Sequence, residues 1–143
     1  MEEMKEFMWR HVGVPYVWTG NTPKGWDCSG AACEFLKTFG ELPLPADMNS
    51  QMLFDYYSKG LAEWNSYKRG ALIFFGKSAA QITHVAVLLN EFLMWEAAGG
   101  DSNCVSVEDS VKRNAFTRFR PIASRHDTFK AVLRPRYRAI GLI

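Results

Sequence analysis

The sequence places a cysteine where a thiol could become reactive. The segment GWDCSGAACEFLKTFG, residues 25–40, runs from a turn into a predicted helix, with Asp27 as a favourable N-cap and Cys28 in the first turn. Unpaired N–H groups and the dipole at a helix start favour negative charge, so they lower the pKa of a thiol and can bind an oxyanion. Burial is the alternative, because Cys28 also begins the apolar stripe of the helix and free cysteine is commonly buried.

A thiolate nucleophile needs a base that is near it in space, and His84 is the best candidate. It lies in ITHVAVLL, a predicted strand, where it shares one face with Ala86 and Leu88. Ala86 is small and leaves room beside the imidazole. A histidine in an apolar strand is also often an ordinary core or edge residue, so both interpretations stay open.

Glu96 could orient the His84 ring, and the register of one hairpin decides whether it does. The strand FLMWEA follows ITHVAVLL after a short turn and ends near this single carboxylate. With a two-residue loop, His84 pairs with Ala97 and Glu96 points to the opposite face. With the three-residue loop 90–92, His84 pairs with Ala98 and Glu96 becomes its diagonal neighbour. A triad therefore requires an odd loop or a bulge; otherwise Glu96 is a polar residue at a strand end.

The elements that must position these side chains are helices first and strands second. Helical spacing of apolar residues predicts helices over residues 2–11, 28–39 and about 48–58, the last capped by Asp47 or Asn49, with a turn-rich loop between the first two. From residue 70 onwards the predicted strands are ALIFF, THVAVLL, FLMWEA, FTRFRPI and FKAVLRPRY. This order indicates an α+β fold rather than repeated βαβ units.

Length and composition point to one globular domain, residues 1–143. The chain is 48% hydrophobic and 14% aromatic, enough for a core. It has no run of 18 apolar residues, so we expect no membrane span, and its N-terminus lacks the apolar region of a signal peptide. Three cysteines argue against a disulfide framework, and no Cys/His cluster has zinc-finger spacing, so we expect no metal site.

Charge is distributed unevenly along the chain. Residues 1–111 carry 8 Lys/Arg and 14 Asp/Glu, a net charge of −6, whereas residues 112–143 carry 9 and 1, a net charge of +8. A basic segment can bind nucleic acid or another polyanion, but no nucleic-acid motif accompanies it here. We therefore favour a basic edge that packs on the acidic body or is solvated.

The segment GVPYVWTGNTPKGWDCSGAACEFLKTFG resembles the NlpC/P60 family of cysteine peptidases, whose motif runs roughly G-x-P-Y-x-W-G-G and then D-C-S-G. LPLPADMNSQ, RGALIFFG and ITHVAVLLNEFLMWEAAGG are similar to its later blocks, in the same order. The resemblance covers about residues 12–100 and fades beyond them. It implies a papain-like α+β fold, with N-terminal helices packed on an antiparallel sheet. The implied activity is cleavage of bacterial cell-wall peptides without a cofactor, often at the γ-D-glutamyl–diaminopimelate bond.

Matched to the motif, the resemblance implies a role for each of five residues. Cys28 is the nucleophile and His84 is the base. Tyr16 matches a tyrosine whose hydroxyl lies beside the cysteine. Asp27 and Ser29 match positions that help to bind substrate near the cleaved bond.

Three positions depart from the family pattern. Thr19 replaces the first glycine of W-G-G, which predicts a differently shaped turn, and Ala71 replaces the aspartate of a G-D-L-x-F-F block. Glu96 occupies the third catalytic position, where the family more often has His, Asn or Gln. A carboxylate there can still orient the imidazole, and it favours the thiolate–imidazolium pair.

Two other function classes stay open. One is a non-catalytic module that binds the cell wall or belongs to a virion, and the other is an amidase or acyltransferase that uses the same Cys28–His84 pair. A cell-wall enzyme without a visible leader would fit a phage protein delivered by a virion tail or released at lysis. On that hypothesis, the basic residues 112–143 are a candidate surface for a virion or tail partner.

Overall fold

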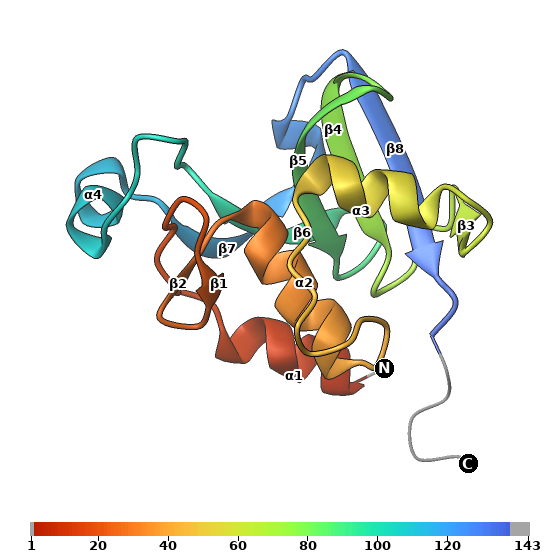
Figure 1. The fold of residues 1–143 in the computed structure, drawn as a ribbon, viewed down its shortest axis with the longest axis horizontal. Helices are drawn as coiled ribbons and strands as arrows, with labels where there is room; N and C mark the ends of the chain where they lie inside the picture. Colours follow the sequence, from red (N-terminus) through yellow and green to blue (C-terminus); the bar gives the residue numbers. More distant parts are fainter. Residues whose placement is uncertain (1, 138–143) are drawn as a thin grey trace.

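Helices and a six-stranded antiparallel sheet make up the fold over residues 2–137, the part of the chain that the computed structural model describes (Figure 1). The helices are α1 (Glu2–Arg10), α2 (Cys28–Thr38), α3 (Ser50–Tyr57) and α4 (Val107–Arg113). The strands are β1 (Asn21–Thr22), β2 (Gly25–Trp26), β3 (Ala62–Trp64), β4 (Leu72–Ser78), β5 (Gln81–Leu88), β6 (Leu93–Ala98), β7 (Phe116–Pro121) and β8 (Phe129–Pro135). The predicted α+β class, with N-terminal helices packed on an antiparallel sheet, is confirmed.

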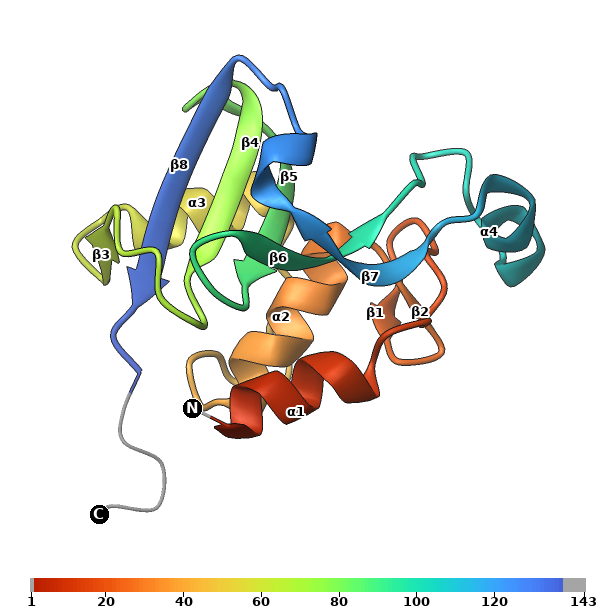
Figure 2. The same ribbon diagram turned by 180° about the vertical axis from the view of Figure 1, so that it is seen from behind.

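The strand order of the sheet is β3-β8-β4-β5-β6-β7, so the last strand lies between two earlier ones. Leu133 of β8 is the register partner of both Leu72 and Trp64. Figure 2 shows β8 running beside β4 along its length. The five predicted strands are present, whereas β3 and the small β1–β2 pair were not predicted, because strands of two or three residues show no periodicity.

The caps of α2 and α3 follow from their sequences. Asp27 accepts a hydrogen bond from the Gly30 N–H at 2.8 Å, and Asn49 accepts one from the Met52 N–H at 2.9 Å. Of the two predicted caps for α3, Asn49 is therefore the one used. Gly40 follows the C-cap of α2 with φ of +78°, a conformation that glycine adopts without strain.

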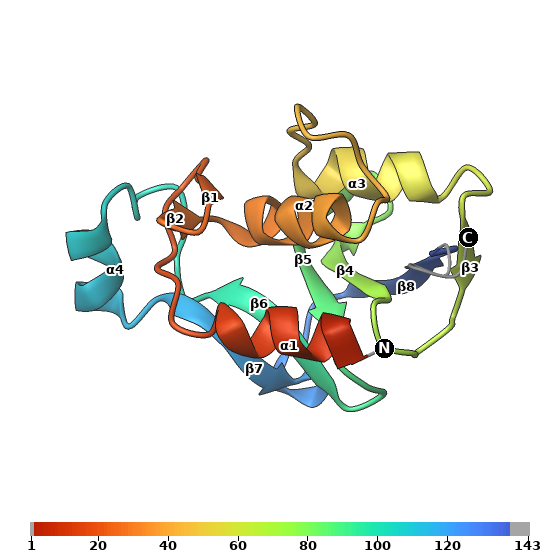
Figure 3. The same ribbon diagram turned by 90° about the horizontal axis from the view of Figure 1, so that it is seen from below.

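The sheet buries apolar side chains on both faces. On the helix-covered face, α2 and α3 lie side by side over β5 (Figure 3), and the core includes Phe35, Phe74 and Trp95. On the other face a smaller cluster contains Ala86 and Met94. Alternation along each strand thus sends neighbouring residues into different cores.

The β5–β6 hairpin has the odd loop that the candidate triad requires. Val87 pairs with Trp95 and Leu88 with Met94, and the Leu89 N–H bonds the Leu93 carbonyl, which leaves the three residues 90–92 in the loop. Asn90 explains the turn, because its Oδ1 accepts hydrogen bonds from the N–H groups of residues 92 and 93. In this register Glu96 is on the same face as His84.

Much of the basic segment is part of the sheet rather than a separate tail. It supplies β7 and β8, and Arg125 pairs with Asp127 through two hydrogen bonds. Arg136 bonds the Gly60 carbonyl at 2.6 Å. Residues 138–143 lie outside the described part of the chain, and a virion or tail partner for this segment stays a prediction. None of the described helices is long and apolar enough to span a membrane.

Candidate active site

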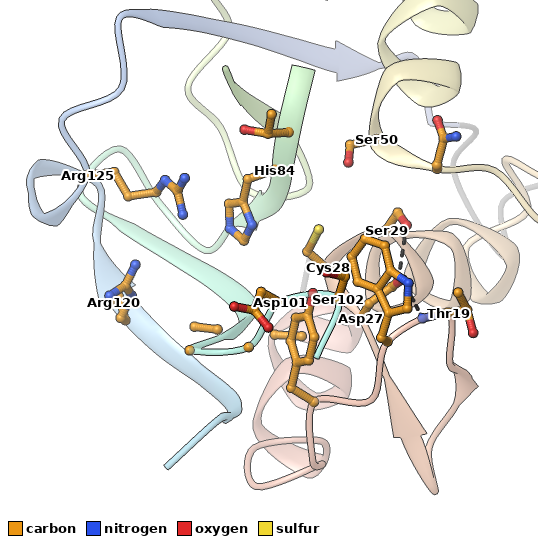
Figure 4. A pocket seen from close by; sticks show the side chains of 18 residues that line it. Thr19, Asp27, Cys28, Ser29, Ser50, His84, Asp101, Ser102, Arg120 and Arg125 are labelled. Carbon is orange, nitrogen blue, oxygen red and sulfur yellow. Dashed lines mark hydrogen bonds between the residues drawn. The ribbon is translucent and has the colours of Figure 1, made fainter. Parts of the chain in front are cut away.

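A cleft of about 630 Å³ opens where the start of α2 meets the sheet. Side chains from the motif loop, α2, β5, β6 and β7 line it. Figure 4 shows His84 facing Cys28, with Arg120 and Arg125 on the side of His84 and Asp27, Ser29 and Thr19 on the other side. All six residues proposed from the sequence contribute to this cleft or to the hydrogen bonds behind it: Tyr16, Asp27, Cys28, Ser29, His84 and Glu96.

Cys28 is the first residue of α2 and is partly buried. Burial opposes the thiolate, but the charge and hydrogen bond of the adjacent His84, followed by a hydrogen bond from the backbone of Val85, outweigh burial and lower the pKa of Cys28 below its ordinary value. Asp27 acts in the opposite direction, since its carboxylate raises the pKa of its neighbour. His84 is therefore the largest of the causes that lower the pKa of Cys28.

His84 and Glu96 form the central contact on the side of the cleft that the sheet provides. The Nε2 atom of His84 lies 2.5 Å from Oε1 of Glu96, whose side chain is fully buried. Because Glu96 occupies Nε2, Nδ1 is the ring nitrogen available to Cys28. Of the two registers considered from the sequence, the one with the three-residue loop is present, and in it Glu96 reaches the ring of His84. Its role as the third catalytic residue stays a prediction.

His84 contacts Glu96 at the point where strands β5 and β6 separate. The two strands pair at Val87 and Leu88, and their pairing does not continue to His84. The register of β5 with β4 also shifts just beyond His84, between Phe75 and Gly76. This opening lets a residue from the helix layer approach His84, although His84 and Glu96 belong to the face opposite the helices.

The charges of the site favour an ionised pair. Burial works against an imidazolium, yet the charge and hydrogen bond of Cys28, followed by those of Glu96, raise the pKa of His84 to about 9. Burial likewise opposes the carboxylate of Glu96, but its bonds to His84 and Arg120 lower the pKa of Glu96. The three shifts all favour the ionised forms, so the arrangement favours thiolate, imidazolium and carboxylate side by side with the guanidinium of Arg120.

Asp27 and Ser29 are bonded to each other as well as to the motif loop. Ser29 donates to Oδ1 of Asp27 at 3.1 Å, and the Thr19 N–H donates to Oδ2 at 3.0 Å. Both side chains line the cleft. Thr19 has φ of +63°, a left-handed conformation that normally favours glycine. Thr19 therefore carries strain at this turn, and a turn shape different from that of the family stays a prediction.

Tyr16 is buried against the same site. Burial, followed by the charges of Cys28 and Asp27, raises the pKa of Tyr16, so its hydroxyl stays protonated and can donate a hydrogen bond. Its ring lies against Gly100, where an added Cβ would come within 2.1 Å of Cδ1. The second glycine of the AAGG sequence is therefore explained by close approach to this ring.

Gly30 completes the motif for a steric reason. A Cβ at this position would lie 2.1 Å from the carbonyl oxygen of Gly20. The start of α2 and the turn around Gly20 can approach each other only without that side chain. Thus the G of D-C-S-G positions Cys28 through backbone packing.

Two arginines of the cleft were not singled out from the sequence. Arg120 donates a hydrogen bond from Nε to Oε2 of Glu96, and Arg125 lines the cleft near His84. Both belong to the basic segment, whose total charge was visible but whose contacts depend on the pairing of β7 with β6. The glutamate itself was the available signal, because a buried carboxylate requires partners for both oxygens.

The remaining departure from the family pattern is remote from this chemistry. Ala71 is fully buried in the smaller core cluster and does not line the cleft. Across residues 2–137 there is no group of three or more His, Cys, Asp or Glu side chains placed to bind a metal.

Comparisons with known proteins identify the family of this fold. The NlpC/P60 family profile matches residues 13–121. The prediction that the likeness fades beyond about residue 100 is wrong, because the match includes α4 and β7, whose partner strand β6 carries Glu96. A search of curated proteins gives no match.

Several solved structures share the fold at low sequence identity. The NlpC/P60 domain of the peptidoglycan hydrolase SagA is 21% identical, with a TM-score of 0.64 over 90% of this chain and 94% of that chain. A family protein from Bacillus cereus is 21% identical, with a TM-score of 0.68 over 95% of this chain, which spans 39% of that protein. The peptidoglycan hydrolase RipB from Mycobacterium tuberculosis is 24% identical, with a TM-score of 0.60 over 93% of this chain and 65% of RipB. With its profile match and this shared fold, the chain belongs to the NlpC/P60 family, which includes peptidoglycan hydrolases.

Proposed function

We propose that this protein is a cysteine peptidase that hydrolyses the stem peptides of bacterial peptidoglycan, at the γ-D-glutamyl–diaminopimelate bond. The observation that carries the proposal is the contact chain from Cys28 through His84 to the buried Glu96, at the edge of an open cleft. Membership of the NlpC/P60 family, together with the likeness to SagA, supports the substrate class.

The first half of the proposed reaction forms a thioester. The Cys28 thiolate attacks the carbonyl carbon of the scissile amide, and the carbonyl oxygen becomes an oxyanion. N–H groups at the start of α2 and the protonated hydroxyl of Tyr16 stabilise it. His84 then gives its proton to the leaving nitrogen, and the C–N bond breaks as the amine departs.

The second half returns the enzyme to its starting state. His84, now neutral, takes a proton from a water molecule as the water oxygen bonds the thioester carbon. The C–S bond breaks, the acid product forms and the Cys28 sulfur leaves as a thiolate. Glu96 holds the His84 ring in one orientation through both halves.

The polarity of the cleft suits a zwitterionic peptide. Asp27 and Asp101 provide carboxylates, while Arg125 provides a guanidinium group. A stem peptide containing diaminopimelate carries both ammonium and carboxylate groups. We assign Asp27 and Ser29 to the binding of substrate beside the cleaved bond.

The test is hydrolysis of a γ-D-Glu–diaminopimelate peptide and of purified peptidoglycan, with chromatographic analysis of the products. We expect the Cys28→Ala variant to lose at least about a thousandfold of kcat/KM. Cys33→Ala is the matched control, because Cys33 is buried in the same helix and bonds the Met48 carbonyl away from the cleft. A Cys28→Ala variant as active as wild type would overturn the proposal.

Two further readouts separate this activity from the other function classes. Products in which an added amine replaces water would identify an acyltransferase instead of a hydrolase. A catalytic Cys28 should be a reactive thiol, whereas a non-catalytic module does not need one. If the protein is an enzyme, we expect iodoacetamide to modify Cys28 near pH 7 much faster than Cys33. Burial raises the pKa of Cys33 to about 11, which slows its alkylation.

A further inference from the structure

The buried carboxylate of Glu96 is held on both sides. One oxygen lies against Nε2 of His84, and the other accepts a hydrogen bond from Nε of Arg120. Arg120 lies on β7 and is paired in register with Met94, two residues before Glu96. Its side chain is 33% exposed at the cleft, whereas that of Glu96 is fully buried. The arginine therefore closes the contact chain at its solvent end.

We propose that Arg120 is a positioning residue of the hydrolase: it neutralises Glu96 and thereby allows His84 to lose its proton after Cys28 has been acylated. This inference rests on the proposed function. It assigns Arg120 no contact with the reacting atoms, and its effect is transmitted through Glu96.

The charge count of the free enzyme gives the first part of the reason. Thiolate, imidazolium, carboxylate and guanidinium sum to zero. Each of the four charged groups contacts a group of opposite charge, and buried charges are tolerated when they are paired in this way. Attack on the substrate starts from this balanced state.

Acylation changes the balance. Once the sulfur of Cys28 is bound in the thioester, its negative charge is gone. With Arg120 present, a neutral His84 leaves a balanced Glu96–Arg120 pair, whereas a protonated His84 leaves an excess positive charge. Without Arg120 the preference reverses, because a neutral His84 would leave a buried carboxylate uncompensated. Hydrolysis of the thioester requires the neutral imidazole, so the arginine favours the second half-reaction.

The other charged groups around His84 are arranged differently. Arg125 and Asp127 lie in the segment that follows β7, and their two hydrogen bonds of 2.8 and 3.0 Å make them a neutral pair. Cys28 faces His84 from α2 and Glu96 faces it from β6. Arg120, unlike Arg125, is bonded to the Glu96 carboxylate that holds the imidazole.

The Arg120→Met variant tests this role through the kinetic step that it slows. We expect kcat at pH 7 to fall by about tenfold to a hundredfold and KM to fall with it, because the thioester accumulates. The ratio kcat/KM should change much less. The acidic limb of the pH profile of kcat should move to higher pH by about one unit or more, since His84 keeps its proton. A pre-steady-state burst of amine product would show the accumulated thioester directly.

The double variant Glu96→Gln/Arg120→Met distinguishes charge balance from simple support. Removing both charges should move the acidic limb back toward its wild-type position and raise kcat above that of Arg120→Met. If Arg120 only supported the local structure, the double variant would be at least as impaired as the single one. Arg120→Lys keeps the charge and should retain the wild-type pH profile, which preserves the test if Arg120→Met folds poorly.

Arg118→Met is the matched control. Arg118 is on the same strand and is the register partner of Glu96, but its guanidinium bonds the backbone carbonyls of residues 114 and 116. Its removal should leave the pH profile unchanged. A wild-type pH profile for Arg120→Met, with Cys28→Ala inactive, would overturn this inference and leave the proposed function intact. Equal activity of wild type and Cys28→Ala would instead overturn the proposed function.

Discussion

The two sides of the cleft are built in different ways. The motif side, from Tyr16 to Gly30, comes from one short stretch of chain, in which Asp27 binds the N–H groups of Thr19 and Gly30. Tyr16 and Trp26 also hydrogen-bond residues 115 and 117, far along the chain. The sheet side takes His84, Glu96 and Arg120 from three strands spread over residues 81–121. The start of α2 is fixed by a cap within the motif, whereas the sheet side depends on strand register and on pairing between distant segments.

The largest expected effect tests whether the two sides are equally necessary. We expect His84→Ala to lower kcat/KM by at least about a thousandfold, a loss similar to that of Cys28→Ala, because the thiolate and the proton donor act as one unit. Peptide hydrolysis at pH 7 measures this loss. For the same reason the Cys28→Ala/His84→Ala double variant should be no worse than either single variant.

His126→Ala is the control for that loss. His126 is exposed and does not line the cleft, so its removal should leave kcat/KM within about twofold of wild type. If His84→Ala retained a large share of the activity, the sheet side would not supply the base.

The contrast between the two sides also shows how far the sequence could predict the site. The N-cap of α2, its apolar stripe and the position of Cys28 in its first turn were predictable because each depends on residues within a few positions of one another. The contact of Glu96 with His84 could be predicted only for one of two hairpin registers. The hydrogen bonds of Asn90 in the turn decide which register forms.

Other features could not be predicted because they depend on distant pairing. The insertion of β8 between β3 and β4 joins segments about 50 to 75 residues apart in the chain. Pairing of β7 with β6 brings Arg120 to Glu96, and no local pattern distinguishes Arg120 from the neighbouring Arg118. The sequence therefore showed a basic segment, and only the fold shows that Arg120 is the arginine bonded to Glu96.

Gly30 tests the packing of the motif side, because we expect its replacement by alanine to destabilise the protein, whereas this substitution in a helix usually stabilises. At an ordinary interior helical position, Gly→Ala stabilises a protein by about 1 kcal/mol. Here the added Cβ would lie 2.1 Å from the Gly20 carbonyl oxygen, so we expect Gly30→Ala to destabilise the protein by about 1–3 kcal/mol. Denaturant unfolding monitored by circular dichroism measures the difference. A variant more stable than wild type would show that the approach of α2 to the motif loop is not tight.

The pH profile sharpens the role of the sheet side. Glu96 contributes to raising the pKa of His84 to about 9, above its ordinary 6.5, so the imidazolium persists through neutral pH and is lost as the pH rises through about 9. We expect kcat/KM to fall above that pH. Glu96→Gln removes the carboxylate and should move this alkaline limb to lower pH by about one unit, which lowers kcat/KM about fivefold at pH 9.

Glu91→Gln is the control for the pH profile. Glu91 is an exposed carboxylate in the loop of the same hairpin, so the variant loses an equal charge away from the imidazole. Its alkaline limb should coincide with that of wild type. An unchanged limb in Glu96→Gln would mean that the carboxylate does not influence the protonation of His84.

The smallest expected effect concerns the strained residue of the motif side. Thr19 has φ of +63°, and a β-branched residue in the left-handed region costs about 1–2 kcal/mol. Thr19→Gly removes that strain and keeps the backbone N–H that binds Asp27, while the added freedom of the unfolded chain offsets about 0.5–1 kcal/mol. We therefore expect a net stabilisation of about 0.5–1 kcal/mol, measured as a rise in Tm of about 2 °C. Thr19→Ala retains the unfavourable φ and should bring no such gain. If both variants were equally stable, the strain would not be local to Thr19, and the turn would be shaped by the rest of the motif side.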